Sequence, residues 1–332
     1  MPSVIPLVTD SDNIGHVEWA GFLGNNAVFA SVEGAVHLLA DRQQVINMHD
    51  GLLAACLAQD GSALITAGED GKVEKLSKDG NTSLVYDANG KWIDRLASGP
   101  NGAVACSWGK NGAVILEQSG VPSEVKPFEC ERSIEGIAFQ PKGMRIALAR
   151  FNGVDLKWVN TNNPSQFLKW DGAHTGVVYS PDGKYVVSTM QENALHGWRL
   201  SDDKHMRMTG YPAKIKSISW SNKGKWLASS GAPAAIVWPF AGKDGPMGKA
   251  PKELGSMGQI MVTHVACHPS EDVVAIGYAN GQILVVRIDD GKEAVLRREG
   301  KGAISTLGWD ATGHRIAFGS ESGEAGIVDI SA

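Results

Sequence analysis

The amino-acid sequence predicts an all-β protein, an eight-bladed β-propeller of four-stranded antiparallel blades. Three observations carry this prediction: short strand patterns recur about every 41 residues, turns that contain glycine separate them, and the 3.6-residue period of helices is missing. Glycine makes up 40 of the 332 residues, about 12%, against roughly 7% in average proteins. Such an excess predicts many tight turns between short strands.

The repeat is clearest at 134–158, 175–198 and 215–238. Each copy holds alternating apolar residues, a turn with Gly, a second apolar run, a second turn and a run that ends in Trp. A unit of about 40 to 45 residues supplies the four strands of one propeller blade. The turn after the first strand marks eight units, at Gly24, Gly61, Gly102, Gly143, Gly183, Gly224, Asp272 and Gly313.

Within a unit, the apolar runs divide into four strands, which we denote a to d in chain order. In the fifth unit they are expected at 177–179, 185–189, 194–200 and 205–209. The eighth unit supplies only strands a to c, at 303–309, 315–319 and 326–330.

The N-terminal residues 3–8 form a strand-like stretch that belongs to no other blade. We expect this strand to complete the last blade and so to close the ring, which protects an edge that would invite aggregation. Pro6 suits an outer edge strand, because a missing N–H matters little there. The whole chain, 1–332, is therefore expected to be a single propeller domain.

Composition and charge exclude several classes of function. The net charge of -5 provides no positive field for nucleic acid or an anionic membrane. The sequence has no run of about 18 apolar residues and no signal-peptide pattern, so we expect a cytoplasmic protein. The four cysteines form no C-x-x-C pair, which disfavours a disulfide framework or a zinc finger. We expect a monomer when the protein is on its own.

The third strand of three units ends in Trp158, Trp198 and Trp238. With this position and the period, the sequence resembles the WD-repeat family, although none of these Trp residues is followed by Asp. The resemblance implies Trp-Ser-His-Asp hydrogen-bonded sets within blades. The fifth unit matches with His174 and Ser188 but has Glu192 in place of Asp, and the second unit has Thr66 and Asp70 but Leu76 in place of Trp. Such a degenerate signature looks like that of a stand-alone bacterial WD-repeat protein.

Catalytic motifs are missing from the sequence. No phosphate-binding loop, Rossmann glycine pattern, H-E-x-x-H or nucleophile elbow appears. His264, Cys267 and His268 form the one metal-like cluster, but in a strand Cys267 faces away from the two histidines. We therefore predict no catalytic residues, no cofactor and no metal, and the alternative is an ion that the two histidines share with a neighbouring blade.

The resemblance implies that the b–c and d–a loops share one face around a central channel, the usual partner surface. Large apolar groups on turns match the composition of interface hot spots, and nearby basic residues strengthen the case. The alternative is that these side chains fold back onto blade edges. The predicted partner-binding residues are Trp92, Arg150, Phe151, Met190, Tyr278, Lys91, Arg132 and Lys214.

The leading hypothesis is a non-catalytic scaffold that binds a protein or peptide on this face. The alternative is a propeller enzyme, or a small-ligand or metal-binding protein, that uses the channel mouth. The Gly-, Lys- and Pro-rich segment 240–258 lengthens the sixth unit and is expected to be an extended c–d connection.

Overall fold

The computed structural model describes residues 3–6 and 14–331. Within these residues the chain forms 30 β-strands and one short 3-10 helix, η1 (Pro100–Gly102), which confirms the all-β class. No helix in this part of the chain is long and apolar enough to cross a membrane. The chain divides into two compact units, 47–210 and the combination of 1–46 with 211–332.

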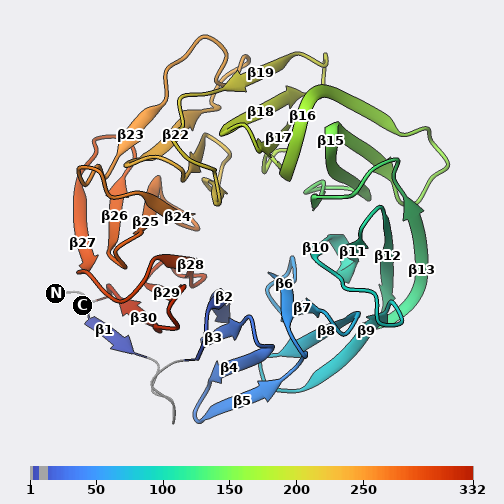
Figure 1. Cartoon of the computed structure of the whole chain (residues 1–332), viewed down its shortest axis with the longest axis horizontal. Helices are drawn as coiled ribbons and strands as arrows, with labels where there is room; N and C mark the ends of the chain where they lie inside the picture. Colours follow the sequence, from blue (N-terminus) through green and yellow to red (C-terminus); the bar gives the residue numbers. More distant parts are fainter. Residues whose placement is uncertain (1–2, 7–13, 332) are drawn as a thin grey trace. The chain divides into compact units, whose positions relative to one another are not determined.

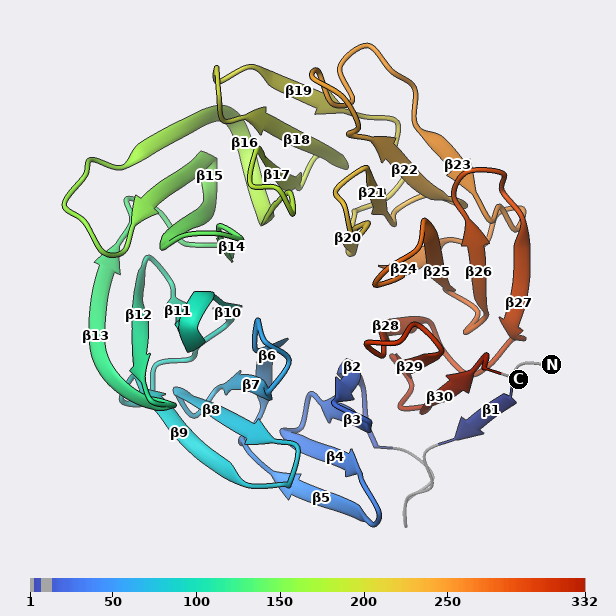
Figure 2. The ribbon, with the colours of Figure 1, turned by 180° about the vertical axis from the view of Figure 1, so that it is seen from behind.

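The 47–210 unit consists of three antiparallel sheets that follow one another in chain order (Figure 1). The first strand of each sheet lies on the concave side of the arc, as the view from behind also shows (Figure 2). The first sheet comprises β6 (Leu52–Leu57), β7 (Ala63–Gly68), β8 (Lys72–Ser77) and β9 (Thr82–Asp87). The second comprises β10 (Arg95–Ser98), β11 (Val104–Trp108), β12 (Asn111–Gln118) and β13 (Val121–Glu129). The third comprises β14 (Gly136–Phe139), β15 (Arg145–Trp158), β16 (Gln166–Tyr179), β17 (Tyr185–Met190), β18 (Ala194–Arg199) and β19 (His205–Met208).

The other unit consists of four antiparallel sheets of four strands each. The first comprises β2 (Val17–Leu23), β3 (Asn26–Ser31), β4 (Ala35–Leu39) and β5 (Gln43–Asn47). The next comprises β20 (Ile218–Trp220), β21 (Trp226–Ser229), β22 (Ala235–Pro239) and β23 (Lys252–Leu254). It is followed by β24 (Val262–Cys267), β25 (Val273–Tyr278), β26 (Ile283–Arg287) and β27 (Glu293–Arg297). The last comprises β28 (Ile304–Trp309), β29 (Arg315–Ser320), β30 (Ala325–Asp329) and β1 (Ser3–Pro6).

The prediction of eight separate blades is wrong, because residues 3–6 and 14–331 form seven sheets, six of four strands and one of six. The difference lies in β15 and β16, which are 14 residues long. β15 pairs with β14 through 146–149 and with β16 through 151–156. The chain bends at Asn152, with φ 68°, and the register shifts there, yet the strand continues. Two repeat units therefore share one continuous sheet.

The N-terminal strand completes the last sheet, as the sequence predicted. β1 pairs antiparallel with β30, with Ser3 opposite Asp329 and Pro6 opposite Gly326. Residues 7 and 8 of the predicted strand lie outside the described residues. All four residues of β1 are exposed, and β1 lies at the end of the strand order, where Pro6 is tolerated.

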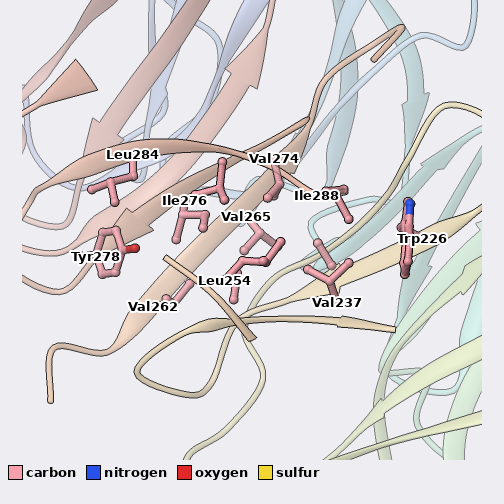
Figure 3. Packing of buried hydrophobic residues seen from close by; sticks show 13 residues of the cluster. Trp226, Val237, Leu254, Val262, Val265, Val274, Ile276, Tyr278, Leu284 and Ile288 are labelled. Carbon is pink, nitrogen blue, oxygen red and sulfur yellow. The ribbon is translucent and has the colours of Figure 1, made fainter. Parts of the chain in front are cut away.

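The core of each unit lies between neighbouring sheets. The sheet β20–β23 contributes Val237 and Leu254 to one such cluster, and the sheet β24–β27 contributes Val265, Ile276 and Tyr278 (Figure 3). These side chains interdigitate because each strand alternates its side chains between two faces, and both faces are covered. Each fully buried aliphatic or aromatic side chain stabilises the fold by roughly 1.5–3 kcal/mol.

Removal of residues 1–6 is expected to destabilise the protein by roughly 2 kcal/mol, because the ladder bonds of β1 are lost. The exposed edge of β30 would then promote self-association. Urea unfolding and size-exclusion chromatography measure both effects. The control is Val4→Ser with Ile5→Ser, two side chains that are 42% and 50% exposed, and this variant keeps the ladder. A truncated chain as stable and monodisperse as the full chain would contradict this account of β1.

Candidate functional site

Two exposed aromatic side chains mark one surface of the 47–210 unit. Trp92 is 61% exposed and Phe151 is 52% exposed. Trp92 lies in the loop 88–94 before β10, next to Ile93, which is fully buried and whose N–H donates to the Gly68 carbonyl at 3.2 Å. Phe151 lies on the bend 150–153 of β15. Backbone hydrogen bonding thus holds both segments in place: Ile93 donates to Gly68, and Phe151 pairs with Ala173 of β16.

The loop 130–135 connects β13 to β14 and is tied to the loops on either side of it. The Cys130 N–H donates to the Lys110 carbonyl at 2.8 Å. Glu135 accepts from Arg95 at 3.1 Å, and Glu131 lies 3.6 Å from the Arg150 guanidinium. We call the surface formed by loops 88–94, 130–135 and 150–153 the loop face.

Arg150 is buried and acts as a positioning residue for this surface. Its Nε donates to Asp155 at 2.6 Å, and its guanidinium lies 4.1 Å from the centre of the Phe167 ring. Its Nη1 also donates to the Phe151 carbonyl at 3.2 Å. Arg150 is thus paired and stacked within its own sheet, and it fixes the bend on which Phe151 is exposed.

Apart from Arg150, the basic residues predicted for the partner surface are solvent-exposed. Lys91 and Arg132 lie on the loop face, and the Lys91 ammonium sits 5.8 Å from the centre of the Trp108 ring. Lys214 is also exposed but belongs to the other unit. The 47–210 unit therefore places Lys91, Trp92, Arg132 and Phe151 on the three loops of the loop face.

Besides Arg150, two further predicted partner-binding residues, Met190 and Tyr278, are buried, with 2% and 0% exposure. They correspond to the alternative in which such side chains fold back onto the sheets. The predicted connection 240–258 is interrupted by β23, so only 240–251 connects β22 to β23. The Tyr278 hydroxyl donates to the carbonyl of Gly255, which directly follows β23, and so anchors the β23–β24 loop to β25. A Cβ at Gly255, whose φ is +65°, would lie 2.7 Å from that hydroxyl. Because both side chains are buried, a partner cannot contact them in this conformation.

The predicted His-Ser-Trp set of the fifth unit is formed. His174 Nδ1 lies 2.7 Å from Ser188 Oγ, and its ring centre lies 5.7 Å from that of Trp198. His174 Nε2 donates to the Trp170 carbonyl at 2.9 Å. Burial lowers the pKa of His174, although this hydrogen bond and the charge of Glu192 oppose the shift. The set ties β16 to β17 and β18.

The second unit forms a related set around His49. His49 Nε2 lies 2.9 Å from Thr66 Oγ1, and Nδ1 lies 3.1 Å from Asp70. Leu76 occupies the Trp position and is fully buried. The imidazole therefore bridges a strand hydroxyl and a turn carboxylate, as the resemblance implied, without the indole.

A third set was missed by the sequence analysis. Tyr211 takes the His position: its hydroxyl accepts from Trp238 Nε1 at 2.7 Å and lies 2.7 Å from Ser229 Oγ. Burial raises the pKa of Tyr211 to about 12. The available signal was the spacing, since Tyr211 precedes Ser229 by 18 residues and His49 precedes Thr66 by 17.

The metal-like histidines are engaged in the fold. His268 Nε2 lies 3.1 Å from the Gly313 carbonyl, and its Nδ1 accepts from the Glu271 N–H at 3.0 Å. Burial lowers the pKa of His264 to about 4. Across the described part of the chain, no three His, Cys, Asp or Glu side chains come close enough together to hold a metal ion.

A polar cavity of about 650 Å³ lies between the sheets β6–β9 and β10–β13. Its wall includes the Lys75–Glu117 ion pair, whose side chains are only 15% and 7% exposed. Hydroxyls and amides make up most of the other lining side chains, among them Ser62, Asn81 and Asn101. Its turns, 58–63 and 99–102, follow the first strand of each sheet. The loop face is made of other segments, the loops before β10 and β14 and the bend of β15.

A family model described as "Anaphase-promoting complex subunit 4 WD40 domain" matches residues 259–332. Curated relatives include periodic tryptophan protein 2 of Saccharomyces cerevisiae, 22% identical over 77% of this chain and 33% of that protein. The intraflagellar transport protein 80 homolog of Mus musculus is 24% identical over 64% of this chain and 28% of its own length. The chain spans about a third or less of these relatives.

Solved structures share the architecture along nearly the whole chain. The computationally designed Ika8 protein superposes with a TM-score of 0.78 at 17% identity, covering 98% of this chain and 100% of its own. The Dos1 propeller superposes with a TM-score of 0.76 at 14% identity, covering 98% of this chain and 95% of that one. At such low identity the likeness concerns the fold alone.

The Tyr211→Phe variant is expected to lose about 1–3 kcal/mol of stability, because the buried Trp238 N–H loses its acceptor. Urea unfolding at neutral pH measures the change. The matched control is Tyr86→Phe, a half-buried tyrosine whose ring stacks on Trp108, and it should change stability by less than about 0.5 kcal/mol. Equal unfolding midpoints for both variants would exclude the structural role of the Tyr211 set.

Proposed function

Because the chain belongs to the WD-repeat β-propeller family, we propose that it is a non-catalytic scaffold that binds a partner protein or peptide through the loop face. The single observation that carries this proposal is the exposure of Trp92 and Phe151 on loops that ion pairs brace. Large aromatic side chains of this kind anchor protein interfaces far more often than other residues do.

The energetics support binding at this surface. Covering one large apolar side chain contributes roughly 1.5–3 kcal/mol, and both rings leave most of that contribution unused in the isolated chain. The Arg95–Glu135 and Arg150–Glu131 pairs already brace the loops, so little ordering would accompany binding. Lys91 and Arg132 add positive charge at the rim, which would orient an approaching partner.

The names of the similar proteins agree with this class of function. One is a subunit of a named complex, and another is a transport protein. We further propose that the partner is a protein rather than nucleic acid or a membrane, which the net charge of -5 supports. We also propose that residues 1–332 act as one domain, and that the protein is cytoplasmic and monomeric on its own.

The Trp92→Ala, Phe151→Ala double variant is expected to weaken partner capture at least about tenfold, because each hot-spot truncation removes more than about 1 kcal/mol. Affinity capture from native cells, quantified by mass spectrometry against wild type, measures the loss. The control is Leu84→Ala with Val125→Ala, which are 52% and 47% exposed on β9 and β13, away from the loop face. If both double variants retain every partner equally, the loop face is not the binding surface.

The polar cavity favours a second candidate function, binding of a small polyol, sugar or amino acid among the hydroxyls and the Lys75–Glu117 pair. A thermal-shift panel of these three compound classes tests it. We expect a concentration-dependent rise in melting temperature for one class in wild type, lost in Glu117→Gln. No shift with any member of the panel would remove this candidate.

A further inference from the structure

The third sheet of the 47–210 unit encloses a histidine among aromatic rings. His196, on β18, is fully buried. Its ring stacks on Trp170 of β16, with the ring centres 4.0 Å apart, and meets Trp198 edge-on at 4.6 Å. His205 of β19 stacks against it at 5.2 Å. Three strands thus close around one imidazole.

Neither ring nitrogen of His196 has a hydrogen-bond partner within the described residues. A neutral imidazole carries one donor and one acceptor, and both are left without a partner here. A second proton would add a charge and another donor to the same aromatic enclosure. The face of Trp170 attracts a cation, but neither N–H group of the ring would have an acceptor. The structure therefore accommodates His196 only as the neutral ring.

The charged groups around His196 also favour the neutral form of its ring. The titratable and charged groups that act on it are His205 and Arg207 on β19 and His174 on β16, and all of these are cationic or become cationic in acid. The carboxylate of Glu192 acts on His174. Burial first, then these neighbours, lower the pKa of His196 to about 3.

A continuous set of contacts connects this histidine to the loop face. Trp170, which stacks on His196, accepts through its carbonyl from His174 Nε2 at 2.9 Å. Two residues further on, the Gly172 N–H donates to the Asn152 side chain at 3.2 Å, and Ala173 pairs with Phe151 in the ladder. Displacement of Trp170 would thus reach the bend that presents Phe151.

We propose that His196 makes the loop face acid-sensitive: proton uptake expels its ring from between the tryptophans, displaces Trp170 and loosens the bend that carries Phe151. This inference rests on the proposed function, because the consequence is a partner that binds at neutral pH and is released in acid. The device requires only a locally opened state in which His196 meets water.

The direction of the effect follows from proton linkage. In the opened state the pKa of His196 returns to about 6.5, whereas in the closed state it stays near 3. The opened state therefore binds the proton more tightly, and closed-state stability is lost as the pH falls through that window. The opened population rises about tenfold for each pH unit within the window.

Hydrogen exchange measured by mass spectrometry or NMR tests this device without any partner. The probes are the Gly172 N–H and the Gln191 N–H, which donates to the Ala173 carbonyl at 2.9 Å. From about pH 7 to about pH 4.5 we expect their protection factors, corrected for intrinsic exchange, to fall roughly 75-fold in wild type. In His196→Phe the fall should be at least about tenfold smaller.

Two further variants keep the outcome interpretable. His314→Asn removes an exposed histidine of the other unit and should behave as wild type. If circular dichroism shows that His196→Phe does not fold, His196→Met takes its place as a second apolar replacement. An equal fall of protection in wild type and in the folded His196 variant would overturn the inference.

The two proposals fail separately. If protection depends on His196 but Trp92→Ala with Phe151→Ala leaves capture unchanged, the acid-sensitive device stands and the loop face is not the partner surface. If capture depends on Trp92 and Phe151 but the pH response of exchange does not depend on His196, only this inference fails.

Discussion

Each sheet in this chain is apolar on both faces, so it is stable only when a neighbouring sheet covers it. Val237 and Leu254 show the principle, because they are buried in one cluster with Val265, Ile276 and Tyr278 of the following sheet (Figure 3). The short strands leave little backbone pairing per sheet, and the free energy of folding therefore depends on apolar contact between consecutive repeats. The hydrogen-bonded sets of His49, His174 and Tyr211 fix strands and loops relative to one another, in addition to the apolar packing.

The strand pattern could be predicted from the sequence because period and turns are local properties of the chain. The pairing of β1 with β30 was also predictable, since the last repeat lacked a strand and residues 3–6 had no other blade. The number of sheets was not predictable. Whether Asn152 ends a strand or bends it depends on pairing with residues 166–173, which the periodicity does not reveal.

The candidate site was predicted in part. Turn positions identified Trp92 and Phe151, and both are exposed. The same argument failed to separate them from Met190 and Tyr278, because the direction of a side chain on a turn depends on tertiary neighbours such as Gly255. Tyr211 and His196 were missed because no motif marks a tyrosine in a histidine position or a histidine without partners.

The union of β1 with β30 has a consequence for biosynthesis. Residues 3–6 leave the ribosome long before their partners, 326–329. During translation β1 has no partner until residues 326–329 have been made, and their pairing closes a very long loop. By contrast, the strands of 47–210 pair with near neighbours in sequence. Synthesis thus favours an order in which the interior repeats assemble early and β1 joins β30 late.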